Sequence, residues 1–248
     1  MQKFIPKFKD FTSRREISKK CEILKIRNFR IDSDGAVSVN GDVNLHDLYS
    51  QKFAYERLYG KYYTDGNLSL PIKFKEIKGD FRIGNSSLGT LYGCPQMVYG
   101  DFDCSYNHLQ SLEYCPQKVG GSFNFSRNFI YNFDGLPSEF DCNLSRMNCD
   151  YNPIWAVIGL VGQNFPPYQF VSRLIEYDVI QGKDIMVDRL SELLGSFDCK
   201  YPMVFPYNLS DYYQAMGHHG GRVEVNSMDD LYKLELPISE MGGNYKLV

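Results

Sequence analysis

One run of residues has a composition suited to anion or metal binding. The run MGHHGGR, at residues 216–222, places His218 and His219 beside glycines and Arg222. Two adjacent histidines on a glycine-rich loop are weak metal ligands unless the fold supplies a third group, so a flexible loop is the simpler interpretation. The sequence lacks a phosphate-binding glycine loop, an HExxH zinc motif, a GxSxG nucleophile motif and an EF-hand. We therefore expect no catalytic residue, no cofactor and no bound metal.

The cysteines are the other group of reactive side chains. There are seven, an odd number, and none forms a C-x-x-C pair, which argues against a disulfide framework or a zinc site. Cys94 and Cys115 occupy equivalent positions of a sequence repeat, where a third copy has Leu136. A position that accepts leucine is a core position, so we expect buried thiols that pack as small apolar groups. Reduced thiols favour an intracellular setting.

A row of polar residues is the first candidate binding surface. The alternation in GDFDCS turns Phe102 and Cys104 toward the core and Asp101 and Asp103 toward solvent. Applied to the neighbouring copies, it predicts an outward, mildly acidic sheet face that consists of Asp80, Arg82, Asp101, Asp103, Ser122 and Asn124. Repeat proteins recognise partners on extended surfaces of this kind, although a solvated face without a partner would have the same composition.

A tyrosine-rich insertion at residues 49–69 is the second candidate. Its side chains combine aromatic area, polar tips and a positive charge, and the candidate binding residues are Tyr55, Arg57, Tyr59, Tyr62 and Tyr63. Tyrosine buries a large area at low entropic cost, and insertions in repeat proteins often carry binding. The alternative is that these tyrosines pack the insertion onto the protein's own side.

A 21-residue sequence repeat must position these candidates. Three copies lie end to end at residues 77–97, 98–118 and 119–139, and a degraded fourth begins at Phe140. Equivalent apolar positions recur in one register, for example Phe81, Phe102, Phe123 and Leu144. A period of about 20 to 29 residues with Leu-x-x-Leu spacing is typical of leucine-rich-repeat-like solenoids.

Two details of the repeat give specific predictions. Asn107 and Asn128 occupy equivalent positions, and we expect both to turn inward and hydrogen-bond neighbouring backbone groups as an asparagine ladder. In the degraded fourth copy, the same alternation predicts Cys142 and Leu144 as the inward pair of a strand.

The segment before the repeats is expected to cap their open end. Ser13, followed by Glu16, predicts a capping box at the start of an amphipathic helix that buries Ile17, Cys21 and either Ile23 or Leu24. The D-G dipeptide at residues 34–35 predicts a hairpin turn between strands at residues 29–31 and 36–39.

After residue 152 the hydrophobic periodicity becomes helical. Asn152 and Pro153 are expected as the N-cap and the first residue of a buried helix. Further helices are expected at residues 168–180 and 183–197, followed by a hairpin of strands at residues 222–225 and 231–236. Leu174, Ile175 and Val179 are expected on the buried face of the first of these helices.

Composition and charge limit the classes of function. The chain has 248 residues, of which 43% are hydrophobic, which indicates a folded protein. Residues 1–78 hold 16 Lys and Arg against 10 Asp and Glu, whereas the remaining 170 residues hold 11 against 20. This excludes a uniformly basic nucleic-acid binder, although a basic N-terminal arm remains an alternative to the cap. Without a long apolar run or a signal-peptide core, we expect neither a membrane span nor secretion.

These observations predict an α+β fold. It comprises a short leucine-rich-repeat-like β-solenoid, an N-terminal cap and a C-terminal helical subdomain. The expected parts are a basic N-terminal cap with a hairpin and the first rung at residues 1–48, the tyrosine-rich insertion at residues 49–69, the solenoid at residues 70–152, and the helical subdomain with a terminal hairpin at residues 153–248.

The sequence resembles the leucine-rich-repeat-like proteins encoded by tailed bacteriophages and related bacterial genomes. The resemblance covers roughly residues 17–152 and rests on RIDSDGAVSVNGDVNL, LPIKFKEIKGDF and GDFDCSYNHLQSLEYCPQKVGGSF, which occur in that order. The insertion and the loss of Cys-Pro at Leu136-Pro137 depart from the pattern. The repeats are also similar to those of bacterial effector ubiquitin ligases, but no cysteine here has Asp two positions later, as the nucleophile motif of those ligases requires.

The resemblance implies a phage-type interaction protein without an assigned reaction. We therefore expect a non-enzymatic module that binds a host or virion protein through the sheet face and the tyrosine-rich insertion. The alternative is a virion structural component that packs against capsid, neck or tail proteins. A metal- or anion-dependent enzyme, resting on His218, His219 and Arg222, is the third hypothesis. The expected location is the host-cell cytoplasm or the virion.

Overall fold

The computed structural model describes residues 13–46, 48, 68–137, 141–142, 146–154, 173–182, 184–196, 203–204, 223–224 and 246–247. The candidate residues of the tyrosine-rich insertion, and His218, His219 and Arg222, lie outside this set. Among the helices within it, none is long and apolar enough to cross a membrane.

Helix α1 (Arg14–Ile23) starts as the sequence predicts. The Ser13 side chain accepts a hydrogen bond from the backbone N–H of Glu16, and the Glu16 carboxylate accepts one from the backbone N–H of Ser13 at 2.8 Å. This capping box satisfies two backbone donors at the helix N-terminus. Ile17 and Cys21 are buried together with Leu24, which confirms the predicted inner face of the helix.

The predicted hairpin follows α1. Strand β1 (Phe29–Ile31) pairs antiparallel with β2 (Val37–Val39), and Gly35 in the turn has a φ of +78°. On its other side β2 pairs in parallel with β4 (Phe74–Ile77). β2 therefore joins the hairpin to the parallel part of the fold.

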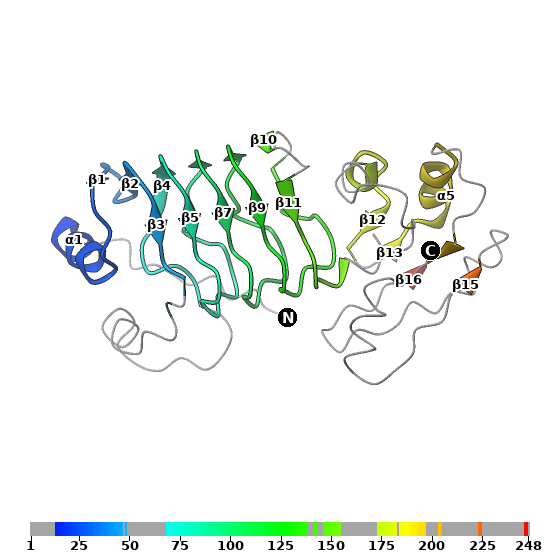
Figure 1. Ribbon diagram of the computed structural model, residues 1–248, viewed down its shortest axis with the longest axis horizontal. Coiled ribbons are helices and arrows are strands. Elements are labelled where there is room, and N and C mark those ends of the chain that lie inside the picture. The colour runs from blue at the N-terminus through cyan, green and yellow to red at the C-terminus, as the bar shows by residue number, and fades with distance from the viewer. Residues whose placement is uncertain are drawn as a thin grey trace.

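The repeats form two parallel sheets, and successive strands alternate between them (Figure 1). Sheet A has the order β1-β2-β4-β6-β8-β10, and sheet B has the order β11-β9-β7-β5-β3. The remaining strands of sheet A are β6 (Met97–Val98), β8 (Lys118–Val119) and β10 (Asp141–Cys142). Those of sheet B are β3 (Val43–Asn44), β5 (Phe81–Arg82), β7 (Phe102–Asp103), β9 (Phe123–Asn124) and β11 (Met147–Asn148).

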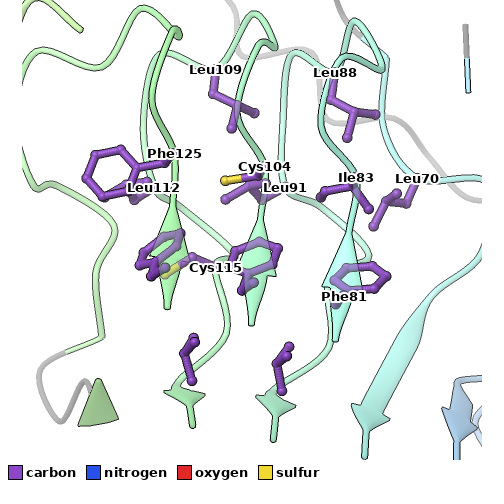
Figure 2. Packing of buried hydrophobic residues seen from close by; sticks show 14 of the residues in the cluster. Leu70, Phe81, Ile83, Leu88, Leu91, Cys104, Leu109, Leu112, Cys115 and Phe125 are labelled. Atoms are coloured by element: carbon purple, nitrogen blue, oxygen red, sulfur yellow. The ribbon is translucent and has the colours of Figure 1, made fainter. Parts of the chain in front are cut away.

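The strand register explains the 21-residue period. Phe81 pairs with Phe102, which pairs with Phe123, so equivalent residues of successive copies lie side by side. Their rings stack at centroid distances of 5.9 and 5.1 Å, and all three side chains are fully buried. Figure 2 shows Ile83, Cys104 and Phe125, which occupy a second equivalent position of the three copies and are also fully buried. Because equivalent positions of successive copies meet along such columns, the period of the sequence specifies which residues form the core.

The fourth copy departs from the predicted register. Met147, rather than Leu144, lies beside Phe123 at the end of sheet B, a spacing of 24 residues instead of 21. Cys142 lies in sheet A beside Val119 and is only half-buried, so it is not the inward residue of a sheet B strand. The prediction was wrong because it carried the 21-residue period past the point where extra residues lengthen the copy.

The C-terminal part contains short strands that the sequence analysis did not predict. Residues 173–176 are helical, but β12 (Ile180–Gln181) and β13 (Asp184–Ile185) then form an antiparallel hairpin, and β13 also pairs with β16 (Lys246–Leu247). Helix α5 (Val187–Ser196) follows, with Leu190 and Leu193 buried. The helix predicted at residues 183–197 therefore begins later than expected, and Ile175 is exposed rather than buried.

One strand of the predicted terminal hairpin pairs with a segment that was not predicted as a strand. Strand β15 (Val223–Glu224) pairs antiparallel with β14 (Met203–Val204). Residues 231–236, its predicted partner, lie outside the described residues. A buried amide links the repeats to the C-terminal part, since the Asn132 side chain donates a hydrogen bond to the backbone carbonyl of Gly182 at 2.7 Å.

Candidate functional site

The aspartates of the predicted sheet face form a ladder at the corner between the two sheets. Oδ1 of Asp80 accepts a hydrogen bond from the backbone N–H of Asp101 at 2.8 Å, and Oδ1 of Asp101 accepts one from that of Ser122 at 2.8 Å. The same bond joins Asp42 to the backbone N–H of Asp80 at 2.9 Å. These carboxylates therefore hold successive copies together, a structural role that the sequence analysis did not assign to them.

Other residues of the predicted sheet face also form hydrogen bonds within the fold. Oδ1 of Asp103 accepts from the backbone N–H of Ser105 at 2.9 Å, and Oδ1 of Asn124 accepts from that of Ser126 at 3.2 Å. Each bond closes a turn at the end of a strand. Arg82 is exposed and pairs with Asp80 at 2.7 Å. The residues of the predicted sheet face thus lie on one surface as expected, but many of their side-chain polar atoms already bond to other groups of the protein.

The asparagine ladder is confirmed. Oδ1 of Asn107 accepts hydrogen bonds from the backbone N–H groups of Ser86 and Leu88, both at 3.0 Å, and its Nδ2 donates to carbonyl groups of two copies. Asn128 repeats this arrangement one copy later. Asn152 extends the ladder by accepting from the backbone N–H of Ile130 at 3.0 Å. Asn152, expected as a helix N-cap, thus takes part in the ladder, and residues 155–172 of the helix predicted after it lie outside the described residues.

The described cysteines behave as core residues. Six are free thiols, of which Cys21, Cys104, Cys115 and Cys149 are buried; Cys94, expected to be buried, is half-buried and packs against the core, as does Cys142. Burial raises the pKa of Cys115 to about 12 and that of Cys21 to about 11, so both thiols stay protonated at neutral pH. Over the described ranges, no three His, Cys, Asp or Glu side chains are grouped to hold a metal ion. Burial thus disfavours the reactive thiolate form of Cys21 and Cys115.

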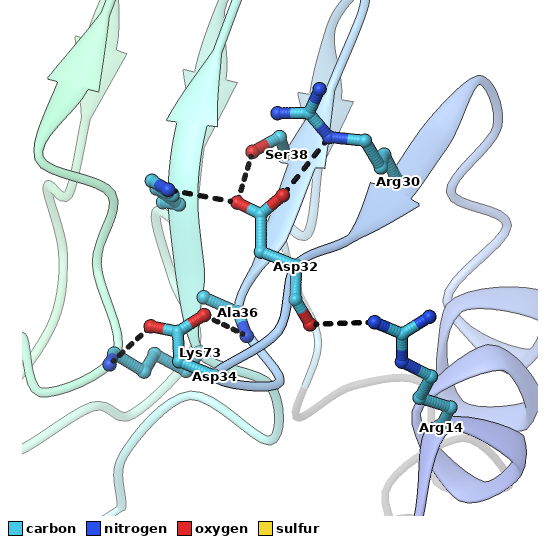
Figure 3. A network of polar contacts seen from close by, with 8 residues as sticks. Arg14, Arg30, Asp32, Asp34, Ala36, Ser38 and Lys73 are labelled. Carbon is cyan, nitrogen blue, oxygen red and sulfur yellow. Dashed lines mark hydrogen bonds and ion pairs between the residues drawn. The ribbon is translucent and has the colours of Figure 1, made fainter.

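A polar network anchors the hairpin to β4 and α1 (Figure 3). The Asp32 carboxylate pairs with Arg30 at 3.0 Å and with Lys75 at 3.2 Å, and it accepts a hydrogen bond from Ser38 at 3.3 Å. Arg14 of α1 donates to the backbone carbonyl of Asp32 at 3.5 Å. Two basic residues of α1 thus contact the rest of the protein, Arg14 through this bond and Lys20 through the backbone carbonyl of Pro71 at 3.1 Å, as expected of a cap.

A group of aromatic residues lies at the turns that follow the strands of sheet B. Arg127 lies between two tyrosines of neighbouring copies, with its guanidinium 4.8 Å from the Tyr106 ring centroid and 4.0 Å from that of Tyr151. Both tyrosines are exposed, at 53% and 43%. Two residues further along two of these turns, His108 stacks on Phe129 at 5.9 Å. We call the five residues Tyr106, His108, Arg127, Phe129 and Tyr151 the aromatic edge.

The backbone fixes the orientation of this edge. Tyr106, Arg127 and Tyr151 have φ values of +53°, +54° and +56°, in the left-handed region that side chains other than glycine and asparagine rarely adopt. Each immediately precedes a ladder asparagine, Asn107, Asn128 or Asn152. Because the asparagine turns inward and is held by several backbone groups, the residue before it is presented to solvent in a defined position.

The sequence analysis missed this edge, although a signal was present. The signal lies in the residues that precede the ladder asparagines. Those residues are aromatic or cationic at positions 106, 127 and 151. Comparisons of the chain with protein-family models, curated proteins and solved structures found no match in any of the three.

Proposed function

We propose that this chain is a non-enzymatic protein-binding module whose repeats form a leucine-rich-repeat-like solenoid. The alternation of strands between two parallel sheets, the 21-residue register and the asparagine ladder support the solenoid. The resemblance of the repeats to phage-encoded leucine-rich-repeat-like proteins supports an interaction role with a host or virion protein. The virion structural component remains the alternative, and no single contact favours it.

The aromatic edge is the observation that carries this proposal. Tyrosine and arginine are the residues that most often dominate binding energy at protein interfaces. Here they are solvent-exposed, and Arg127 is held between two rings, so little side-chain freedom remains to be lost on binding. A surface that is both aromatic and ordered is suited to a protein partner.

The sheet face contributes less in this proposal. The side-chain oxygens of four of its residues each already accept a hydrogen bond from a backbone N–H group of the repeats, namely those of Asp80, Asp101, Asp103 and Asn124. A partner that competed for those oxygens would have to offset the loss of the internal hydrogen bonds. We therefore place the main contact on the aromatic edge and treat the sheet face as its margin.

Affinity capture with matched variants tests the proposal. The double variant Arg127→Ala, Tyr151→Ala should lose capture of a specific host or virion protein by more than about tenfold, because it removes two anchor side chains. Tyr99→Ala is the matched control, since Tyr99 is also an exposed tyrosine, at 46%, and contacts Lys78 beside sheet A. Undiminished capture by the double variant, or equal loss in the control, would rule out the aromatic edge as the interface.

A further inference from the structure

A groove crosses the opposite turns of the repeats, where the chain enters the strands of sheet A. Its volume is about 360 Å³, and its lining includes Lys73, Tyr92, Gln96, Tyr114 and Gln117. Tyr92 and Tyr114 come from neighbouring copies and meet edge to face, with ring centroids 5.2 Å apart. The groove is separate in sequence from the aromatic edge, because it is built by the residues that precede each strand of sheet A.

Tyr114 has a backbone conformation that the fold does not require of a tyrosine. Its φ is +69°, and the equivalent residues of the neighbouring copies are Gly93, with φ +96°, and Gly135, with φ +91°. Glycine adopts this region freely, whereas a bulky side chain there is strained by roughly 1–2 kcal/mol. Such strain concentrates at functional sites. A residue that costs stability where glycine serves the other copies indicates a role for its side chain.

The flanking glycines leave the Tyr114 ring accessible. Tyr114 is 44% exposed, and both Gly93 and Gly135 line the same groove without a side chain of their own. Tyr92 supports the ring from one side through the edge-to-face contact. The result is a braced aromatic platform in the middle of a shallow, open depression.

The polar lining contains two lysines, each paired with an aspartate, and two glutamines. Lys73 pairs with Asp34 at 3.3 Å, and Lys75 pairs with Asp32 at 3.2 Å, so each ammonium group already has a carboxylate partner within the protein. Gln96 and Gln117 occupy equivalent positions of two copies, and each amide carries two N–H donors and a carbonyl acceptor. The groove can therefore both donate and accept hydrogen bonds, and its lysines already have internal carboxylate partners.

We propose that this groove binds a neutral oligosaccharide. The apolar C–H face of a sugar ring packs on the exposed face of Tyr114, and its hydroxyl groups, which are donors and acceptors at once, bond to the Gln96 and Gln117 amides. A phosphate or sulfate ligand would require cations free of internal partners. A proline-rich peptide would present chiefly carbonyl acceptors, and would leave the acceptors of this groove unpaired.

Isothermal titration of the full chain tests this proposal. The probes are the neutral hexasaccharides of cellulose, chitin and amylose, together with a sulfated heparin hexasaccharide and a proline-rich decapeptide. At least one neutral hexasaccharide should bind, and Tyr114→Gly should weaken that binding by about tenfold or more. Tyr99→Ala should leave the affinity within about twofold.

The Tyr114→Gly variant is informative because glycine is the residue of the neighbouring copies, so its melting temperature should stay close to that of the unaltered chain. Arg127→Ala should not change saccharide binding, which separates this site from the proposed protein interface. Lack of binding by all three neutral probes would overturn the proposal. So would Tyr114-dependent binding of only the heparin fragment or the peptide, or full affinity in Tyr114→Gly.

Discussion

At the scale of single residues, one buried amide organises each copy. Asn107 is 4% exposed and satisfies two backbone N–H donors and several carbonyl groups at a turn that has no strand partner. Buried backbone groups without partners are costly, so an irregular turn can be buried only if a side chain replaces the missing bonds. The first copy has Ser86 at this point, whose hydroxyl donates to the backbone carbonyl of Leu45 at 2.8 Å.

Replacing the ladder amide should therefore destabilise the fold strongly. We expect Asn107→Ala to lower the free energy of unfolding by about 3 kcal/mol or more, because it removes the acceptor of two buried N–H donors, those of Ser86 and Leu88, and the side-chain donor to the Ile83 carbonyl. Urea denaturation measures this loss. Gln110→Ala, which removes an exposed amide from the same copy, should change the value by less than about 0.5 kcal/mol. Similar effects for both variants would contradict the ladder's role.

Individual residues differ in how well their structural roles could be predicted from the sequence. Asn107 and Asn128 were predictable because one polar residue recurs at a fixed position among apolar ones. The strain at Tyr114 was not predictable, because a positive φ becomes visible only when the backbone is known. The aspartates were assigned to the correct side of the sheet, but their bonds to the next copy depend on distances that alternation alone cannot give.

At the scale of elements, the corner between the sheets depends on the Gly-Asp pair. A Cβ at Gly100 would overlap Oδ1 of Asp80, the atom that accepts from the backbone N–H of Asp101. The absence of a side chain at Gly100 thus allows the preceding copy to approach closely enough for the aspartate ladder to form.

A methyl group at this corner should separate two neighbouring copies. Gly100→Ala should destabilise the protein by about 2 kcal/mol or more, because the aspartate must move and its hydrogen bond is lost. Gly84→Ala is the matched control, since the nearest atoms to its Cβ would lie 3.3 Å away, and it should cost less. Differential scanning calorimetry would show the order of the melting temperatures, and a reversed order would contradict this role of the corner.

The contribution of the hairpin's ion pairs to stability should be lost at acid pH. The hydrogen bond from Lys75, with the charge of Arg30, holds the pKa of Asp32 below its usual value. A carboxyl whose pKa is lowered on folding stabilises the protein above the unfolded-state value of about 3.9, and this stabilisation is lost as the pH falls through the folded-state pKa.

The variant Asp32→Asn isolates this contribution. It should be less stable than the unaltered chain at pH 7, and the difference should shrink as the pH falls below about 4, because both chains then lack the charge. Urea denaturation between pH 7 and pH 2 measures the difference. Glu22→Gln, which removes an exposed carboxylate of α1, serves as the control. A stability difference that stays constant with pH would show that the ion pairs of Asp32 do not stabilise the hairpin.

At the scale of the whole molecule, the sequence predicted the regular part of the chain better than its end. α1, the hairpin and the repeated inward residues follow from capping chemistry, turn chemistry and a constant period. The hairpin of β12 and β13 was missed because strands of two residues have no measurable periodicity, although Gly182 between them is a turn signal. The lengthened fourth copy was missed because a constant period predicts residue positions correctly only while every copy has the same length.

The two candidate surfaces lie on different turns of the repeats. The aromatic edge follows the strands of sheet B, and the groove around Tyr114 precedes the strands of sheet A. Both depend on residues that depart from the repeat consensus while the backbone of the copies is kept. The regular positions build the scaffold, and the irregular ones carry the proposed recognition.

Site-specific photo-crosslinking tests the proposed protein interface most directly. A benzophenone amino acid is placed at position 106 in one sample and at position 99 in another, and each is irradiated in a host lysate. We predict one dominant protein adduct from position 106, absent from position 99 and lost when Arg127→Ala is added. The same adducts from both positions, or an adduct from position 106 that is insensitive to Arg127→Ala, would contradict recognition through the aromatic edge.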